Sequence, residues 1–259
     1  MTDDILLTDI ADGVATVTLN RPRQMNALSA EMRRRFTATL PELGRDDRVR
    51  VVIITGAGEK AFSAGADLKE LETAPLTAAD LGPESPISQA FAALGKPSIA
   101  AVNGFAITGG MELAINCDII VGSTTARFAD THARVGIVPG WGMSQLLPRL
   151  IGPVRARYMS YTGNFVDAAT AKAWGLLLDV LSPVDLLPYC RKLALEIASC
   201  DRTTLDDVRR AINGGLATSL PEGLALEGRL SQAAAARFDK DGFAGTRAAV
   251  MSRGKDQGA

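Results

Sequence analysis

A carboxylate and a histidine stand out among the residues able to perform acid–base chemistry. Glu112 follows the glycine pair Gly109-Gly110, within a stretch from Asn103 to Leu113 that comes after the apolar run 97–102. His132, the only histidine in the chain, lies downstream, just before the glycine-rich turn at 136–142. A carboxylate can take a proton, and near neutral pH an imidazole can accept one or an imidazolium donate one. The two side chains are therefore candidates for acid–base work.

Two glycine-bearing turns must position this chemistry. Ala64-Gly65-Ala66 follows an expected strand at 48–55, and Gly109-Gly110 opens an expected helix. Ligands of open α/β sheets bind where a strand gives way to a helix, and a helix start leaves several backbone N–H groups without partners. One N–H from each turn could therefore meet on one oxygen and stabilise negative charge as it develops there.

Each of these residues also fits a purely structural role. Neither turn matches the phosphate-binding patterns G-x-x-x-x-G-K-[ST] or G-x-G-x-x-G, so the glycines alone indicate only turns. Glu112 alone fits a first-turn acid that favours the helix dipole, and Trp141 alone fits core packing. A single histidine such as His132 is more often a hydrogen-bonded residue of the surface or core than a catalytic residue. Spacing by itself leaves both interpretations open.

Composition excludes several classes of protein. The 259 residues are 47% hydrophobic and 22% charged, with a formal net charge of −1, which offers no general attraction for nucleic acid or an anionic membrane. The three cysteines and one histidine form no metal-ligand spacing, and nicotinamide or flavin fingerprints are missing. The acidic start of the chain lacks a signal-peptide pattern, so we expect a soluble protein of the reducing cytoplasm without a membrane span.

The hydrophobic pattern predicts an α/β core. We expect a hairpin of strands at 5–10 and 14–20 with its turn at Asp12-Gly13. A helix should begin after the N-cap Ser29 and end near Leu43, closed by Gly44. The strand at 48–55 is apolar on both faces, as in a buried parallel sheet, and strands and helices then alternate to about residue 183.

Two regions depart from this alternation. The segment 72–88 carries three prolines and a weak period, which indicates a mobile loop or short irregular helix near the site. After Pro183 strand signals disappear, and the expected elements are successive helices at 184–199, 203–217, 222–238 and 243–252. That part is rich in alanine and small residues, which suits close helix packing or a subunit interface.

Taken together, five segments resemble the enoyl-CoA hydratase/isomerase, or crotonase, family. The resemblance covers about residues 5–185, and the order of the segments is highly specific. It is carried by Ala64-Gly65-Ala66-Asp67-Leu68, Ala101-Val102-Asn103-Gly104, Gly109-Gly110-Met111-Glu112-Leu113-Ala114, Cys117-Asp118-Ile119-Ile120 and Gly136-Ile137-Val138-Pro139-Gly140.

This resemblance implies a fold and a ligand. The fold is a spiral of β-β-α turns, here assigned to 1–195, followed by a helical region at 196–259 that assembles homotrimers, often paired into hexamers. An acyl-CoA thioester carbonyl lies between backbone N–H groups that map onto Ala66 and Gly109. CoA enters as part of the substrate, with no separate cofactor or metal. Its binding residues map onto Ala64, Asp67, Leu68, Lys69, Gly110 and Trp141.

One site residue departs from the family pattern. Hydratases of the family use two glutamates; the first maps onto Glu112, and the second falls on His132. An imidazole can still take part in acid–base catalysis, although its charge differs from that of a second carboxylate. Asp130 would point the same way as His132 if both lay on a strand, and could orient the imidazole.

Three functions follow from these residues. The leading one is a lyase of fatty-acid metabolism that adds water across the 2,3 double bond of an enoyl-CoA thioester, with Glu112 and His132 as catalytic residues. The alternative is another reaction of the same oxyanion hole: isomerisation, decarboxylation or thioester hydrolysis. The third is a non-catalytic CoA-binding or scaffold protein, whose RNA-binding variant is disfavoured by the near-neutral charge.

Overall fold

A computed structural model describes residues 4–239 and 243–256 of the chain. The chain divides into two compact units, the first ending at Cys200 and the second beginning at Asp201. The sequence-based boundary at 195/196 lies a few residues earlier, within the last helix of the first unit. Over the described residues, no helix combines the length and apolar character needed to cross a membrane.

The first unit contains two sheets, and successive strands in its middle part alternate between them. One sheet has the order β1-β2-β3-β5-β7-β10, and the other the order β4-β6-β8-β9. In the pairs β3/β4, β5/β6 and β7/β8 the first strand enters the larger sheet and the second the smaller one, whereas β1 and β2 both belong to the larger sheet. The strands are β1 (Leu6–Ala11), β2 (Val14–Leu19), β3 (Val51–Gly56), β4 (Ala61–Ser63), β5 (Ser98–Val102), β6 (Phe105–Ile107), β7 (Ile119–Ser123), β8 (Arg127–Ala129), β9 (Val166–Asp167) and β10 (Asp179–Leu181). The predicted β-β-α spiral is therefore confirmed.

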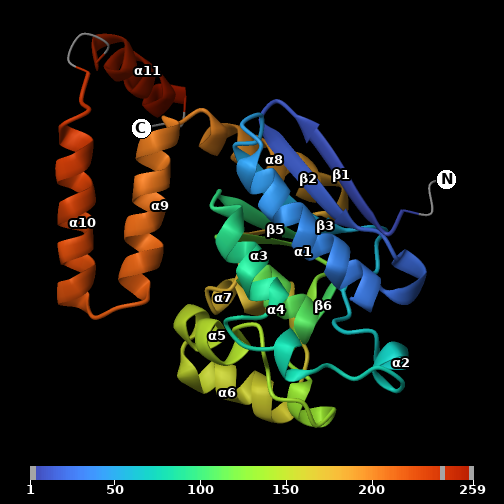
Figure 1. Ribbon diagram of the computed structural model, residues 1–259. Helices are drawn as coiled ribbons and strands as arrows, with labels where there is room; N and C mark the ends of the chain where they lie inside the picture. The colour runs from blue at the N-terminus through green and yellow to red at the C-terminus, as the bar shows by residue number, and fades with distance from the viewer. Residues whose placement is uncertain (1–3, 240–242, 257–259) are drawn as a thin grey trace. The chain divides into compact units, whose positions relative to one another are not determined.

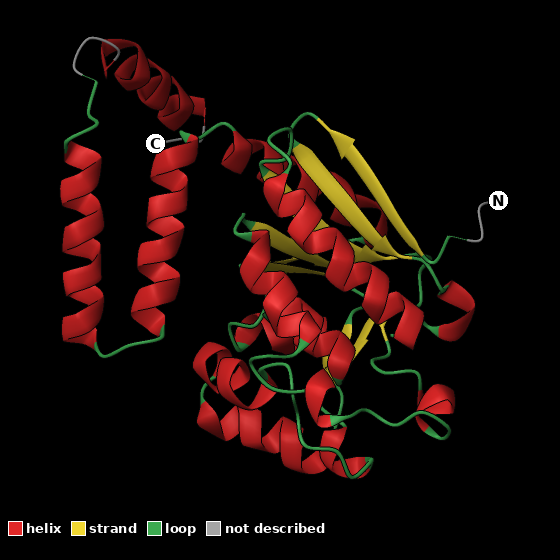
Figure 2. Ribbon diagram, in the orientation of Figure 1, coloured by secondary structure: helices red, strands yellow, loops and turns green. Residues whose placement is uncertain are grey.

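Helices surround both sheets of this unit (Figures 1 and 2). Helices α1 and α3 pack on one another, and α8 packs on strands of the larger sheet. The helical segments are η1 (Pro22–Gln24), α1 (Ala30–Arg45), α2 (Leu68–Leu71), η2 (Ala78–Asp80), α3 (Pro86–Leu94), α4 (Gly109–Ile115), η3 (His132–Arg134), α5 (Met143–Ile151), α6 (Pro153–Thr162), α7 (Ala168–Ala173) and α8 (Pro183–Ala198).

Strand β3 shows why the larger sheet is buried on both faces. Successive side chains of a strand point to opposite faces. Val52 and Ile54 join the core cluster that includes Phe36 of α1, whereas Ile53 joins a second cluster with Leu186 of α8. Every residue of β3 is buried, and β3 pairs in parallel with both β2 and β5. The predicted two-faced parallel strand is confirmed.

Local signals in the N-terminal part also predict the structure well, with one exception. Asp12 and Gly13 join the antiparallel strands β1 and β2, and the Ser29 hydroxyl accepts from Met32 N as the N-cap of α1. Gly44 does not close α1, however, because the helix continues to Arg45. A Cβ at Gly44 would lie 2.6 Å from the Ala93 carbonyl oxygen, so this glycine permits close approach of α3.

The segment expected to be irregular contains only short elements. Within 72–88 lie η2 and the first residues of α3, which begins at Pro86 after the N-cap Ser85. The remaining residues of the segment form turns and extended chain. This part of the chain contributes Leu76 and Leu81 to the cavity described below.

The second unit is helical, as its sequence predicts. It contains α9 (Arg202–Leu216), α10 (Leu220–Ala235) and α11 (Phe243–Asp256). Helices α9 and α10 form an αα-hairpin in which Gly215 and Gly223 face one another; a Cβ on Gly223 would lie 3.1 Å from Gly215 Cα. No residue of α9 or α10 is buried, and several of their apolar side chains, including Val208, Ile212 and Leu216, are exposed.

Candidate active site

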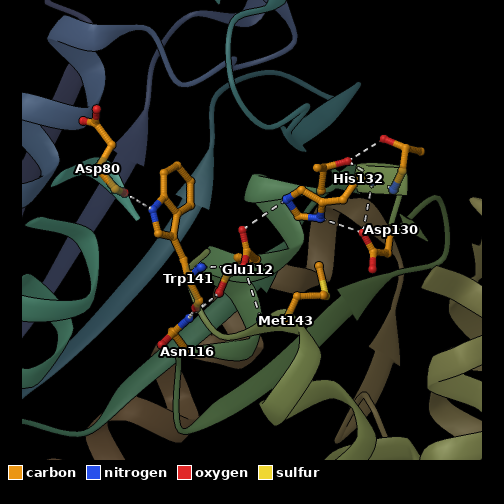
Figure 3. A network of polar contacts seen from close by, with 9 residues as sticks. Asp80, Glu112, Asn116, Asp130, His132, Trp141 and Met143 are labelled. Carbon is orange, nitrogen blue, oxygen red and sulfur yellow. Dashed lines mark hydrogen bonds and ion pairs between the residues drawn. The ribbon is translucent and has the colours of Figure 1, made fainter. Parts of the chain in front are cut away.

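Glu112 lies in the first turn of α4, directly after β6, with only 1% of its surface exposed. Its Oε1 atom accepts hydrogen bonds from Trp141 N at 2.8 Å and from Met143 N at 3.2 Å (Figure 3). Trp141 lies in the turn that precedes α5, and Met143 is the first residue of α5 (Met143–Ile151). Because Oε1 is held by two backbone groups, Oε2 is the carboxylate oxygen left to act on a ligand.

His132 faces that second oxygen. Its Nε2 atom lies 3.5 Å from Glu112 Oε2, and its Nδ1 atom lies 2.7 Å from Asp130 Oδ1 (Figure 3). The expectation that a strand aligns Asp130 with His132 is wrong, since β8 ends at Ala129 and His132 begins η3. The turn brings the two side chains together instead, and Asp130 Oδ1 also accepts from His132 N at 3.2 Å.

The two carboxylates determine the charge of this imidazole. Burial disfavours the imidazolium, but the contacts with Asp130 and Glu112 outweigh burial and raise the pKa of His132 to about 9. Burial raises the pKa of the Asp130 carboxyl, but hydrogen bonding by the His132 and Ser160 side chains outweighs burial and holds that pKa below its usual value. Near neutral pH the site therefore contains an imidazolium between acidic groups.

Asp130 has little freedom to serve any other partner. It is 1% exposed, and its Oδ2 atom accepts no hydrogen bond of normal geometry among the described residues, although Ser160 is its neighbour. Its Oδ1 atom is taken by the ring and the backbone of His132. Asp130 is therefore placed to orient and charge His132 rather than to touch a ligand.

The two glycine-bearing turns meet beside Glu112. Gly65 has φ of +85°, and a Cβ there would lie 3.1 Å from Gly109 N. Leu28 pairs with this turn by donating to Gly65 O and accepting from Asp67 N, so the intervening Ala66 N–H points away from Leu28. In the described part of the chain neither Ala66 N nor Gly109 N donates to a protein acceptor.

A cavity of about 320 Å³ joins these groups. Glu112 and His132 lie on its wall together with the backbone of the two turns, and most other lining side chains are apolar. Trp141 is 4% exposed, and a Cβ on Gly109 would lie 2.8 Å from its Cζ3 atom. Of the predicted site residues, the cavity is lined by Ala64, Ala66, Leu68, Gly109, Glu112, His132 and Trp141.

A second cavity, of about 690 Å³, is lined by the remaining residues predicted to bind CoA, with the exception of Gly110. Asp67 and Lys69 line it, and Ala64, Ala66 and Leu68 line both cavities. Arg21 and Arg23 bring further positive charge to it. The Asp67 carboxylate is already engaged within the protein, because its Oδ2 atom forms a 2.9 Å ion pair with Arg21.

Gly110 is placed away from both cavities. A Cβ at this position would overlap the Ser63 carbonyl, so Gly110 lets the start of α4 lie directly against β4. Its role in the structure is therefore close packing beneath the site. The sequence-based expectation of a ligand contact at Gly110 has no counterpart in the lining residues of either cavity.

Sequence reasoning missed the residues that hold Trp141. Asn116 Nδ2 donates to Glu112 O and to Trp141 O, both at 2.8 Å, and thus ties the turn to α4. The indole Nε1 donates to Asp80 O at 2.7 Å (Figure 3). Asn116 lies one helical turn after Glu112, a spacing that could have signalled its position; nothing in the sequence signals the Asp80 contact.

Comparison with known proteins adds the following findings. Residues 9–248 match the sequence profile described as enoyl-CoA hydratase/isomerase. YngF of Bacillus subtilis, named for the same two activities, is 42% identical over 88% of each chain. The crystal structure of an enoyl-CoA hydratase from Mycobacterium tuberculosis has a TM-score of 0.76 and 40% identity, covering 88% of this chain and 98% of that one. An enoyl-CoA hydratase from Bacillus anthracis has a TM-score of 0.85 and 34% identity, covering 96% and 97%.

Proposed function

The chain belongs to the enoyl-CoA hydratase/isomerase family of enzymes, and from that premise we propose that it hydrates the 2,3 double bond of an enoyl-CoA thioester. One observation carries the proposal. Glu112 Oε2 and His132 Nε2 lie 3.5 Å apart on the wall of a cavity that also contains the Ala66 and Gly109 turns. A base, an acid and an oxyanion site thus border one space.

The proposed oxyanion hole consists of the Ala66 and Gly109 N–H groups. Addition of water to the β carbon of an enoyl thioester pushes electrons through the conjugated system to the carbonyl oxygen. Two fixed N–H donors stabilise that enolate without reorganising as charge develops, and removal of one such donor typically costs about 3 kcal/mol of barrier. Their lack of protein acceptors in the described chain leaves both available for the thioester oxygen.

Glu112 and His132 divide the proton transfers between them. A water oxygen about 2.8 Å from both Oε2 and Nε2 fits beside the 3.5 Å gap. Its oxygen bonds to the β carbon while one proton passes to Glu112 Oε2, and the imidazolium gives its Nε2 proton to the α carbon. Transfer of the proton from Glu112 to His132 then restores the starting state. The product is a 3-hydroxyacyl-CoA, and atoms and charge balance.

Asp130 makes His132 suitable for the acid role. With Nδ1–H donating to Asp130, the Nε2–H of the imidazolium points toward Glu112 and the cavity. The raised pKa of His132, about 9, keeps this proton in place near neutral pH. The pair therefore supplies one proton donor and one acceptor, as two glutamates sharing one proton would.

The CoA moiety is proposed to occupy the second cavity. That cavity adjoins the oxyanion hole through Ala64, Ala66 and Leu68, and Arg23 and Lys69 there can meet phosphate groups. Asp67 acts on CoA only indirectly, by fixing Arg21. Because hydration is redox-neutral and the polarisation comes from backbone N–H groups, the proposed reaction uses no separate cofactor or metal.

We also propose homo-oligomeric assembly through the second unit, as a trimer or a dimer of trimers in the cytoplasm. Val208, Ile212 and Leu216 of α9 recur every four residues and are 49%, 57% and 68% exposed. Leu220 and Leu224 of α10 are also exposed. Such apolar faces are stabilised when another subunit covers them.

Hydration of crotonyl-CoA and longer 2-enoyl-CoA thioesters tests the proposed reaction. We expect turnover by the wild type and losses of kcat on the order of 100-fold or more in Glu112→Gln and in His132→Gln. Glu59→Gln, which changes an exposed carboxylate outside the cavities, is the matched control. Equal activity of all variants would refute both catalytic assignments.

A parallel screen of substrates distinguishes hydration from the other reactions that the same oxyanion hole could support. It offers 3-enoyl-CoA, malonyl-type and saturated acyl-CoA thioesters and identifies the products. Isomerisation, decarboxylation or thioester hydrolysis without hydration of any enoyl-CoA would overturn the lyase assignment while keeping the oxyanion hole. Tight binding of acyl-CoA without any turnover would instead favour a non-catalytic CoA-binding protein.

A further inference from the structure

Thr108, the residue before the oxyanion-hole glycine, has an unusual backbone. Its φ is 55° and its ψ is −115°. Positive φ is disfavoured for residues other than glycine, and most strongly for β-branched ones. Of the other non-glycine residues described with positive φ, Asp12, Met25 and Asn26, none is β-branched. Thr108 is therefore strained at the entrance to α4, and neighbouring contacts must offset that strain.

The Thr108 side chain is bonded to the residue that precedes His132. Thr108 Oγ1 lies 2.5 Å from Thr131 Oγ1 and accepts from Thr131 N at 3.3 Å. The Thr108 backbone N–H also donates to Ala129 O at 2.9 Å. Three contacts therefore join Thr108 to Ala129 and Thr131, in the stretch of chain directly before His132.

The strained backbone decides where the Gly109 N–H points. Thr108 O accepts from Glu112 N at 2.9 Å. In a planar trans peptide the C=O and the following N–H point in opposite directions. Because the Thr108 carbonyl points along α4 toward Glu112, the Gly109 N–H points back toward the cavity that Thr108 and Thr131 also line. A change in the Thr108 dihedral angles would rotate this peptide and move the donor.

We propose that the Thr108–Thr131 hydroxyl pair is a positioning device, which holds Thr108 in its strained conformation and thereby aims the Gly109 N–H at the thioester oxygen. This inference rests on the proposed oxyanion hole but adds residues that neither touch the reacting atoms nor carry protons. The same pair connects the oxyanion donor to the turn of His132. It therefore couples the position of the donor to that of the proton donor.

The proposal predicts an unusual order of variants at position 108. Thr108→Val keeps the β-branched strain and loses the hydroxyl bond, so its peptide should relax away from the cavity. We expect kcat to fall on the order of 10-fold, a fraction of the loss caused by removing an oxyanion donor, with KM nearly unchanged. Thr108→Gly has no strain to offset. It should keep kcat within about threefold of wild type, and Thr108→Ser should resemble wild type.

Thr131 supplies the second half of the test. Thr131→Val should lower kcat in the wild-type background by a factor similar to that of Thr108→Val. In the Thr108→Gly background it should have little further effect, because the bond it removes no longer holds a strained residue. Thr8→Val, on an exposed position of β1, is the matched control and should leave kcat and the melting temperature unchanged.

An optical measurement separates this inference from the proposed reaction. A 2,4-dienoyl-CoA thioester bound in the oxyanion hole should absorb at longer wavelength than free thioester, because the N–H donors polarise its carbonyl. The red shift should shrink in Thr108→Val and Thr131→Val and persist in Thr108→Gly, whether or not the wild type hydrates enoyl-CoA. Circular dichroism and melting temperature confirm that each variant is folded.

Two outcomes would overturn the proposal. If glycine at position 108 reduces kcat and the red shift more than valine does, the Thr108 side chain acts by packing rather than by offsetting strain. If Thr108→Val and Thr131→Val both retain the wild-type red shift and kcat, the hydroxyl pair does not position the donor. In the second case an active wild type would leave the proposed hydration intact.

Discussion

Asp130 and His132 form a buried contact of 2.7 Å between Oδ1 and Nδ1, on the side of the imidazole opposite Glu112. The ring is therefore held between two carboxylates, one that orients it and one that shares its cavity. This arrangement gives the histidine a charge that its solution pKa would not give it at neutral pH.

The wild-type rate should fall in alkaline solution. If the His132 imidazolium supplies the α proton, kcat is constant near neutral pH and decreases as pH rises through about 9, the raised pKa of the ring. Initial rates with saturating crotonyl-CoA between pH 6 and 10.5 measure this decrease, which is the basic limb of the pH–rate profile. A rate that increases over the same range would mean that neutral His132 acts as a base.

Asp130→Asn should move that limb to lower pH. The amide removes the negative charge that favours the imidazolium, so the pKa of His132 decreases and protonated enzyme becomes scarcer at neutral pH. We expect a basic limb at least one pH unit lower, and a lower kcat at pH 8 than at pH 6. Asp9→Asn, an exposed change on β1, should retain the wild-type profile.

The same ion contacts should make stability depend on pH. The pKa of His132 is raised in the folded state, from an ordinary value of 6.5 to about 9. Its contribution to stability is therefore complete below about pH 6.5 and is lost as pH rises through about 9. The melting temperature of wild type minus that of His132→Gln should decrease over this window. A difference that increases with pH would contradict the assigned charge.

Trp141→Ala should lengthen the acyl chains that the enzyme accepts. Trp141 lines both the 320 Å³ cavity and a neighbouring cavity of about 250 Å³, next to Arg33 and Ile87. Removing the indole joins the two spaces, while the Trp141 backbone N–H still holds Glu112. The ratio of kcat/KM for a long-chain to a short-chain 2-enoyl-CoA should rise on the order of 10-fold, the lower end of the discrimination that one methylene provides in an apolar pocket.

Trp174→Ala serves as the control for this change. Trp174 contacts Tyr158 edge to face, has the Arg155 guanidinium over its ring, and lines none of the three cavities described. It should leave the chain-length ratio unchanged even if the protein loses stability. An unchanged ratio in Trp141→Ala would show that the indole does not limit the cavity.

Asn26→Ala should destabilise the fold. Asn26 is fully buried, and its side chain accepts from Arg21 N and donates to the carbonyls of Ala57 and Ala61. Its φ of 53° also suits asparagine better than alanine. We expect a loss of about 3 kcal/mol in the free energy of unfolding, from unsatisfied polar groups and backbone strain. Urea denaturation measures it, and exposed Asn164→Ala should cost under about 0.5 kcal/mol.

Much of the fold could be predicted because its signals are local. The Ser29 cap, the Asp12-Gly13 hairpin and the two-faced pattern of β3 each depend on residues a few positions apart. The predicted end of α1 is wrong because the glycine at position 44 is explained by α3, a segment distant in the sequence. Gly44 permits close approach of α3 and does not terminate α1.

The amino-acid sequence by itself determined the family, the β-β-α order and the identities of Glu112 and His132 as candidate catalytic residues. The two residues follow from their types and from the neighbouring glycines, whereas the family and the β-β-α order follow from the resemblance of five segments spread over about residues 5–185. Only the tertiary structure decided that Asp130 faces the imidazole, that Trp141 N holds Glu112 and that Thr108 is bonded to Thr131. Those contacts join separate turns, and their geometry depends on how the two sheets and their connecting segments pack. The type of each residue can be read from the sequence, whereas its protonation state and the direction in which its side chain points depend on the packing of the folded chain.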